Sequence, residues 1–475
     1  MDALGNSFNK LTQKAQLLIK RSANRHLKLA VTGLAGAGKT AFVTGLVNQM
    51  TANNPNQQLP LWRVCRQQRL LGIKRVMQPD VNIASFDYQG AMASLSQNPP
   101  QWPASTSNIS ELRLAIKYRP NKGLLSHVTD TAILYLDIVD YPGEWLLDLP
   151  MLKQSYNEWC MQQSSRCKAF ASSPCYADYL KAIQGLNLEL AANEDELKNI
   201  AELYRLLLND LVHKQGYYWA QPGRMLLPGE LAGTPLLTFF PILSSDPRFF
   251  EHLNNAPANS AYQVLKHRYQ QYSSKIIKPF YQHYFSGFDR QIVLVDCLSA
   301  LNKGRSQFED MKTALNNILD SFKFGQNGIL KRLFAPNIDK LVFAASKIDH
   351  VSRDQQSNVL NLLSEMLQQS QQNAAFEECQ VETMAISAIT ATKQGVVDSD
   401  EGKIDVVKGV NLQTGEQVTL FPGEVPSQLP KDNFWEDQGF NFCAFQPPSI
   451  EQNQSTYQHI RLDHLLEFLL GDKLQ

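Results

Sequence analysis

Residues 33–40 have the sequence Gly-Leu-Ala-Gly-Ala-Gly-Lys-Thr. This sequence matches the pattern G-x-x-x-x-G-K-[ST]. The glycines free consecutive backbone N–H groups to point into one concavity that can hold phosphate oxygens. Lys39 can reach a β- or γ-phosphate as a point charge, and the Thr40 hydroxyl can bind Mg²⁺. A chance match in a glycine-rich turn is the alternative, but an apolar run at 27–32 and a helix-compatible segment at 41–50 supply the context that the motif requires. The motif predicts a phosphate-binding loop whose nucleotide contacts are Gly33, Ala35, Gly36, Ala37, Gly38, Lys39, Thr40 and Ala41.

Asp140 follows a nearly continuous apolar run at 131–139 and begins the sequence Asp-Tyr-Pro-Gly. Such a run is typical of a central parallel strand that is buried on both faces. An aspartate at the carboxyl end of a strand beside a phosphate loop can hold Mg²⁺ through water, and the N–H of Gly143 can turn toward a γ-phosphate. The pattern predicts Asp140 as support for Mg²⁺ and Gly143 as part of a nucleotide-sensitive turn.

Prolines predict an extended, irregular loop at 99–106, just before a strand-like alternation at 112–118. A threonine in such a loop can close on Mg²⁺ and the γ-phosphate. Thr106 is the predicted ligand and Ser105 the second choice, with Trp102 as a further nucleotide contact. The alternative is an ordinary loop with a packed tryptophan.

A basic cluster at 63–75 predicts either a solvated face or an arginine that reaches the phosphates.

A second set of residues suits recognition of a base. Ser346-Lys347-Ile348-Asp349 follows the apolar run 340–345 and is a variant of the guanine motif [NT]-K-x-D, with serine in the first place. A carboxylate can accept two hydrogen bonds from guanine, a donor pair that adenine lacks, while the lysine stem covers the face of the base. Ser387-Ala388-Ile389 follows another strand-like run and fits a loop whose N–H contacts the guanine oxygen. The alternative for each is a strand-end turn. The predicted base contacts are Lys347, Asp349, His350, Ala388 and Ile389.

Apolar runs and helical periodicity indicate the elements that must position these residues. The expected strands are 27–32, 131–139, 291–296, 340–345 and 380–386, which suit a mostly parallel sheet. Helical periodicity dominates between the second and third runs, with a stripe of Leu197, Ile200, Tyr204, Leu207 and Leu211 after the cap residue Asn193. A loop is expected at 221–241, helices at 261–285, 305–323 and 457–470, and a β-hairpin at 406–420.

Composition limits the class of protein. The 475 residues suffice for two to four domains, and a hydrophobic fraction of 43% predicts a folded globular protein. Forty-five basic and 45 acidic residues cancel, which argues against a specific nucleic-acid binder. Seven scattered cysteines without C-x-x-C spacing predict reduced thiols and a cytoplasmic location. Residues 1–26 predict a basic amphipathic helix, which either docks on its own domain or contacts a membrane surface.

Several motifs together carry a resemblance. The phosphate loop, Asp140–Gly143, Ser346–Asp349 and Ser387–Ile389 stand in the order found in G proteins, accompanied by Trp102-Pro103 and by Val-Asp-Cys-Leu at 295–298. The chain resembles the YcjX family of bacterial P-loop GTPases over nearly its full length. That resemblance implies a Ras-like G domain with helical and β additions, bound GTP or GDP, GTP hydrolysis, and a link to stress responses through an unidentified protein effector. Glu144 departs from the glutamine that often follows D-x-x-G and orients water.

The expected fold is α/β, a doubly wound P-loop domain of the Ras-like type built from residues 27–145 and 286–395. We expect an inserted helical domain at 146–285, an addition with a β-hairpin at 396–450 and a C-terminal helix region at 451–475. The expected function is Mg²⁺-dependent GTP hydrolysis by a conformational switch. Lys39, Thr106, Asp140 and Gly143 would serve hydrolysis, and Thr40, Thr106 and Asp140 would hold the metal. An ATPase or kinase, and a non-catalytic module that binds GTP and recruits a partner, are the alternatives.

Overall fold

The computed structural model describes residues 25–121, 129–321, 338–373, 379–399, 402–431, 434–437, 440, 442–449 and 456–475. Most of the helix predicted for residues 1–26 lies outside the described residues, and so does the membrane contact predicted for it. Its last two residues, Arg25 and His26, belong to strand β1 (Arg25–Gly33), so the predicted boundary is wrong there. These two residues pair with Leu134 and Tyr135 of the neighbouring strand, which extends β1 before its apolar run begins.

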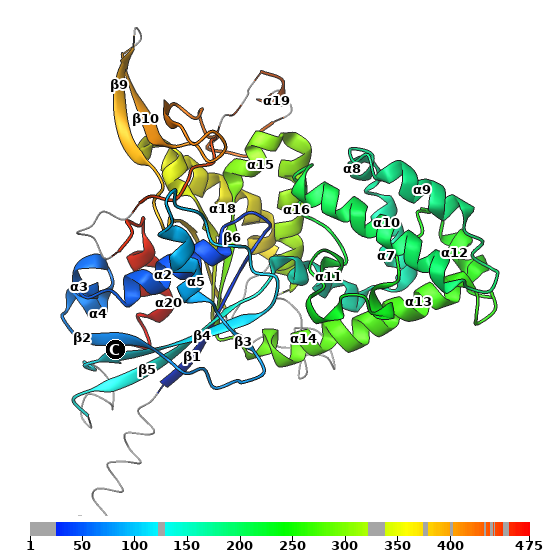
Figure 1. The fold of residues 1–475 in the computed structure, drawn as a ribbon, viewed down its shortest axis with the longest axis horizontal. Coiled ribbons are helices and arrows are strands. Elements are labelled where there is room, and N and C mark those ends of the chain that lie inside the picture. The colour runs from blue at the N-terminus through cyan, green and yellow to red at the C-terminus, as the bar shows by residue number, and fades with distance from the viewer. Residues whose placement is uncertain are drawn as a thin grey trace, which may run out of the picture.

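The strands of the main sheet lie in the order β2–β4–β5–β1–β6–β7–β8, with β3 paired to β4. Figure 1 shows this sheet with the strands from β1 to β6 labelled. The strands are β2 Leu70–Val76, β3 Ala84–Ser85, β4 Ser110–Tyr118, β5 Ala132–Asp140, β6 Arg290–Val295, β7 Lys340–Ala345 and β8 Gln380–Ala385. Neighbours from β5 to β8 are parallel, whereas the β4–β5 and β2–β4 pairs are antiparallel. The predicted mostly parallel α/β sheet is confirmed. Because parallel strands end at one edge, the segments after β1, β5, β6, β7 and β8 gather there.

Alternate residues of the central strands are buried on opposite faces of the sheet. In β1, Leu29 and Val31 pack toward helices α2 (Lys39–Met50) and α20 (Leu462–Leu470), whereas Ala30 joins the core on the other face. Helices α15 (Cys297–Lys303), α16 (Arg305–Ser321) and α18 (Gln356–Asn373) cover that second face. Burial on both faces explains why these strands read as continuous apolar runs rather than as an alternating pattern.

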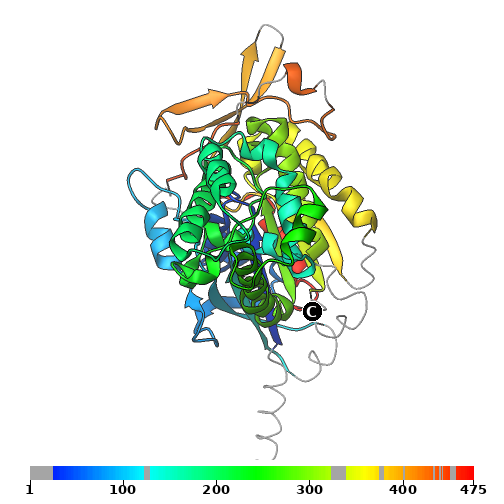
Figure 2. The same cartoon turned by 90° about the vertical axis from the view of Figure 1, so that its right-hand side faces the viewer.

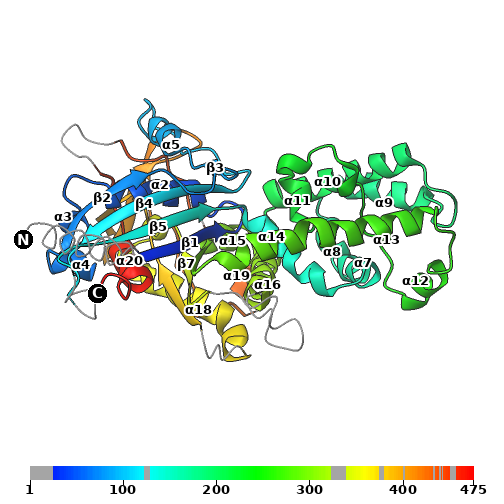
Figure 3. The same ribbon diagram turned by 90° about the horizontal axis from the view of Figure 1, so that it is seen from below.

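Helices between β5 and β6 lie to one side of the sheet (Figure 3). They comprise a 3-10 segment Gly143–Lys153 and helices α7 Tyr156–Ser164, α8 Cys167–Phe170, α9 Tyr176–Gly185, α10 Glu194–His213, α11 Gly223–Leu226, α12 Pro247–Leu253, α13 Ala261–Tyr272 and α14 Lys278–His283. The side chain of Asn193 caps α10, and the predicted apolar stripe of this helix is buried. The helix expected at 261–285 is present as α13 and α14 joined by a π turn just before Pro279, whose missing N–H cannot close an ordinary helical hydrogen bond.

The loop that contains α11 contacts the segment after β5. The Gly223 N–H donates to Asp148 at 2.8 Å, and Trp145 donates to the Leu227 carbonyl at 3.3 Å. The α-carbon of Gly223 lies so close to Glu144 that a Cβ would overlap the Glu144 carbonyl oxygen. This close approach joins the helical region to the turn that follows Asp140.

We expect Gly223→Ala to destabilise the chain by about 1–3 kcal/mol, because the added methyl group has no room and the backbone must shift. Gly185→Ala, at the end of α9, is the matched control: its Cβ would meet no described atom within 4 Å. That change is expected to be neutral or to stabilise by about 0.5–1 kcal/mol, since glycine weakens helices. Urea unfolding of both variants is the measurement, and equal effects would contradict the close packing.

A separate antiparallel sheet projects from the top of the molecule (Figure 2). It holds β9 (Lys393–Ser399), β10 (Gly402–Val410) and β11 (Gln417–Leu420). The hairpin predicted at 406–420 is confirmed by the pairing of β10 with β11. The last helix is confirmed, but it begins at Leu462 rather than at 457, because Ile460 pairs with Ser387 and Arg461 has a φ of 60°. The division of the chain into domains stays a prediction.

Candidate functional site

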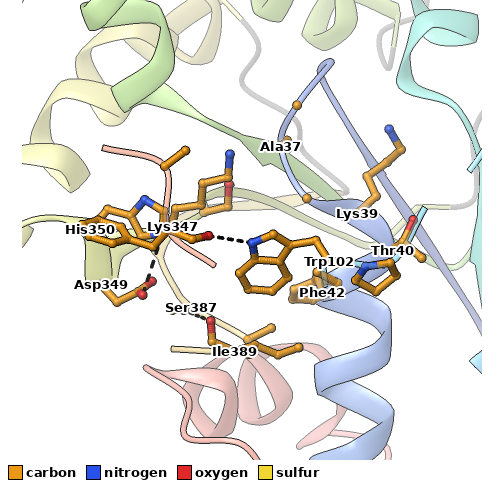
Figure 4. A pocket seen from close by; sticks show the side chains of 18 of the residues that line it. Ala37, Lys39, Thr40, Phe42, Trp102, Lys347, Asp349, His350, Ser387 and Ile389 are labelled. Carbon is orange, nitrogen blue, oxygen red and sulfur yellow. Dashed lines mark hydrogen bonds and ion pairs between the residues drawn. The ribbon is translucent and has the colours of Figure 1, made fainter. Parts of the chain in front are cut away.

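A cavity of about 280 Å³ lies at the carboxyl edge of the sheet (Figure 4). The phosphate loop, the 99–106 loop, the Ser346–Asp349 turn and the 387–389 loop all contribute to its wall. The predicted site residues that line it are Gly36, Ala37, Gly38, Lys39, Thr40, Ala41, Trp102, Ser105, Thr106, Lys347, Asp349, His350, Ala388 and Ile389. Gly33, Ala35, Asp140 and Gly143 are not among the lining residues. Segments far apart in the sequence therefore meet around one space.

The phosphate loop has the backbone shape that its glycines permit. Gly36 and Gly38 have φ values of 76° and 79°, which side chains rarely allow. Gly38 is the N-cap of α2 and no side chain caps this end, so the first N–H groups of the helix face the cavity without an intrahelical partner. The Lys39 ammonium lies 3.4 Å from the Gly33 carbonyl oxygen. This arrangement can hold a phosphate group.

Two threonines and an aspartate converge beside the phosphate loop. The Thr106 hydroxyl donates to Asp140, and the hydroxyls of Thr40 and Thr106 lie 3.1 Å apart. Because a hydroxyl has one proton, Thr40 is the donor of that second bond. The other oxygen of Asp140, Oδ1, is buried and has no hydrogen-bond partner among the described atoms. Burial, with a smaller contribution from Glu144, raises the pKa of Asp140 to about 6, although Lys39 and Thr106 oppose the shift. An under-neutralised carboxylate beside two hydroxyls is a suitable set of donors for Mg²⁺.

The turn after Asp140 is fixed by contacts on both sides. Tyr141 is fully buried; its hydroxyl accepts a hydrogen bond of 2.5 Å from Gln291, and its carbonyl accepts one from Thr32. Gly143 abuts the phosphate loop so closely that a Cβ would overlap the Gly33 carbonyl oxygen. Glu144 is 8% exposed, and its Oε2 has no partner among the described atoms. Gly143 and Glu144 thus lie in the turn just after Asp140, but neither of them lines the cavity.

The opposite end of the cavity holds a second unpaired carboxylate oxygen. Asp349 accepts a hydrogen bond from the Ala391 N–H at 2.7 Å through Oδ2, while its Oδ1 is buried and has no partner among the described atoms. Lys347 has a φ of 59° and its ammonium lies 2.6 Å from Asp296. Burial alone would raise the pKa of Asp296, but Lys347 and Ser299 hold it below its usual value. Burial lowers the pKa of His350, so this imidazole is neutral near pH 7. Contacts from neighbouring residues therefore hold Lys347 and one oxygen of Asp349 in place, while Asp349 Oδ1 remains an acceptor without a partner among the described atoms.

Several residues that line the cavity belong to none of the predicted motifs. Phe42, Leu412, Ala444 and Phe445 join the wall, and Asp296 fixes Lys347 from outside it. Two sequence signals drew attention to Asp296, its position at the end of a strand and the Val-Asp-Cys-Leu sequence at 295–298, but neither predicted its contact with Lys347. The basic cluster at 63–75 does not reach the cavity: Arg63 pairs with Glu467, and Arg69 donates to the carbonyls of Arg119 and Leu474.

Comparisons with known proteins agree over the whole chain. A family model described as YcjX-like family, DUF463, matches residues 27–474. The chain is 60% identical over 486 aligned positions to a protein of Shewanella oneidensis MR-1 named Ras-like GTPase YcjX, with 100% of each chain covered. It is 43% identical over 471 positions to an Escherichia coli K12 protein of the same name, covering 98% of this chain and 100% of the relative.

Among the described residues, no helix is both long and apolar enough to cross a membrane.

Proposed function

We propose that this chain, which belongs to the YcjX-like family, binds GTP and GDP with Mg²⁺, hydrolyses GTP slowly and acts as a nucleotide-dependent conformational switch. The names of the Shewanella and Escherichia relatives support GTP hydrolysis, and the cavity supports the choice of ligand. A cytoplasmic location, a protein effector and a link to stress responses stay predictions that rest on composition and family resemblance.

One observation carries the proposal: at each end of the cavity region stands a buried carboxylate oxygen that has no hydrogen-bond partner among the described atoms. Asp140 Oδ1 lies at the phosphate-loop end and Asp349 Oδ1 at the other. A buried acceptor that lacks a hydrogen bond costs about 1–3 kcal/mol, so each is expected to gain a partner when a ligand binds. A cation suits the first and the paired donors of guanine suit the second.

The described residues assign the remaining roles. Lys39 and the N–H groups at the start of α2 would hold the β- and γ-phosphates. Thr40 and Thr106 would bind Mg²⁺ directly, with Asp140 in support, and Gly143 would respond to the γ-phosphate. Mg²⁺ would supply positive charge against the phosphate oxygens. Lys347, held by Asp296, would cover one face of the guanine.

Single-turnover hydrolysis tests the proposal. Protein in excess over γ-labelled GTP is expected to release labelled phosphate slowly with Mg²⁺ and not with EDTA. GTP that binds tightly but stays intact would indicate the non-catalytic module instead. Equal binding and hydrolysis of ATP would indicate the ATPase alternative.

Glu144→Gln is expected not to lower the rate of this hydrolysis greatly. The side chain is buried and does not line the cavity, and its charge opposes ionisation of Asp140, so it is poorly suited to activate water. The single-turnover rate is the measurement, with Glu202→Gln, half-exposed on α10, as the control. A drop of more than about a hundredfold, the scale of losing a general base, would show that Glu144 is a catalytic group.

A further inference from the structure

Part of the cavity wall comes from the C-terminal region, outside every nucleotide-binding motif. Leu412 follows β10, and Ala444 and Phe445 lie in residues 442–446, here called the C-terminal strap. Phe445 is 1% exposed, so its ring is a packed part of the wall. The cavity is thus closed on this side by chain that no motif predicts.

Hydrogen bonds on both sides position the strap. The Gln446 N–H donates to the Val410 carbonyl at 2.8 Å, and the Leu412 N–H donates to the Ala444 carbonyl at 2.8 Å. Asn302, on α15, accepts from the Phe442 N–H at 3.1 Å and donates to the Phe442 carbonyl at 2.7 Å. These bonds tie the strap to the projecting sheet and to the helix after β6.

The ring of Phe445 is seated against the base-recognition turn. It meets the His350 ring edge-on, with 5.0 Å between centroids, and His350 directly follows Asp349. The ring also approaches Gly409 of β10, where a Cβ would come within 2.6 Å of the Phe445 Cδ1 atom. Glycine at this position therefore leaves the space that the phenylalanine ring occupies.

A hydrogen bond links the strap to the loop that carries Thr106. The indole N–H of Trp102 donates to the Phe445 carbonyl oxygen at 2.7 Å. Figure 4 shows the Trp102 indole between the phosphate-loop residues and the Asp349–His350 turn. Thr106, a few residues along the same loop, bonds to Asp140 and lies 3.1 Å from Thr40. One loop thus touches the proposed metal site at one end and the strap at the other.

We infer that the C-terminal strap encloses the base of the bound guanine nucleotide, and that the bond from Trp102 to Phe445 must open before the nucleotide leaves. This inference rests on the proposed function, since it requires a guanine nucleotide in the cavity. The two aromatic side chains exclude water from the base, which strengthens its hydrogen bonds to Asp349. Thr106 holds the loop that also carries Trp102, so it keeps the bond from Trp102 to Phe445 closed. Through this bond, the release of the nucleotide depends on the phosphate end of the site.

Release of labelled GDP into an excess of unlabelled GDP tests the inference. Trp102→Phe keeps an aromatic ring and loses the donor, so we expect release to be about threefold to tenfold faster, the worth of one hydrogen bond. Phe445→Ala removes the ring, and we expect release to be at least about tenfold faster. Phe445→Leu, which fills more of the space, is the second variant at this position in case alanine disturbs folding. Thermal unfolding checks that each variant is folded.

Two controls separate a lid from a general loosening of the site. Phe421→Ala changes an exposed phenylalanine of the same region and is expected to leave release unchanged. The affinity for Mg²⁺-pyrophosphate, which lacks a base, is expected to be the same in the wild type and in the strap variants. If GDP release were unchanged in Trp102→Phe and in both Phe445 variants, the inference would be wrong but the proposed function would stand. The same would follow if pyrophosphate affinity fell by the same factor as GDP release rose. Failure of the wild type to bind GDP would overturn the proposed function together with it.

Discussion

Replacing Lys39 with alanine is expected to weaken GTP and GDP binding by at least about a hundredfold and to leave the chain folded. The ammonium lies at the start of α2 and lines the cavity, where it can meet two phosphate groups. Each hydrogen bond to a charged partner contributes about 1.5–3 kcal/mol, so the loss of two corresponds to a factor of roughly 10²–10⁴. Lys39 also opposes the rise in the pKa of Asp140, so its removal weakens the neighbouring metal site as well.

The folded state is expected to tolerate this change because the Lys39 side chain is only half-buried. Within the described part of the chain, its ammonium makes one long hydrogen bond, 3.4 Å to the Gly33 carbonyl oxygen. Alanine is also a good helix former at the start of α2. Equilibrium binding of labelled GTP and urea unfolding are the measurements, with the exposed Lys181→Ala on α9 as the control. Unchanged GTP affinity in Lys39→Ala would show that residues 33–40 do not bind the phosphates.

Local patterns allowed much of this fold and site to be predicted. The phosphate loop could be predicted because its glycines, lysine and threonine act within one turn and the next helix. Thr106 and Asp349 could be predicted because each stands at the end or start of a strand, at the edge where parallel strands deliver their loops. The sheet followed from runs of buried apolar residues.

Features that depend on distant partners could not be predicted in this way. Strand β2 is an edge strand with a bulge between Leu70 and Gly72 and with exposed charges at Lys74 and Arg75, so it lacks an apolar run. The start of α20 is set by pairing with residue 387, far along the chain. The bond from Trp102 to Phe445 spans 343 residues and involves a backbone carbonyl, which no side-chain pattern records.

Changing Asp349 to asparagine is expected to convert a guanine site into one that favours xanthine. Wild-type protein should bind GTP more tightly than ATP by on the order of a thousandfold, because the adenine ring nitrogen is an acceptor and would leave the buried carboxylate unpaired. In the variant, the Ala391 N–H still needs an acceptor, so the amide oxygen is expected to take the place of Oδ2. The amide NH₂ then takes the place of Oδ1 and faces the base, where it meets the carbonyl that xanthine carries in place of the exocyclic amine of guanine.

The predicted reversal depends on this orientation of the amide, so competition binding of GTP, XTP and ATP to both proteins is the test. Asp349→Asn should lose GTP affinity, because two donors would face each other, and should gain XTP affinity by a comparable factor. Asp398→Asn, at an exposed position on β9, should change neither. Among the described atoms, Asp349 Oδ1 has no partner and Oδ2 is already bonded, so base recognition requires a gain of XTP in the variant. A variant that lost GTP without gaining XTP would indicate a disturbed turn rather than base recognition. Equal wild-type affinities for GTP and ATP would remove Asp349 from the base site and favour the ATPase alternative.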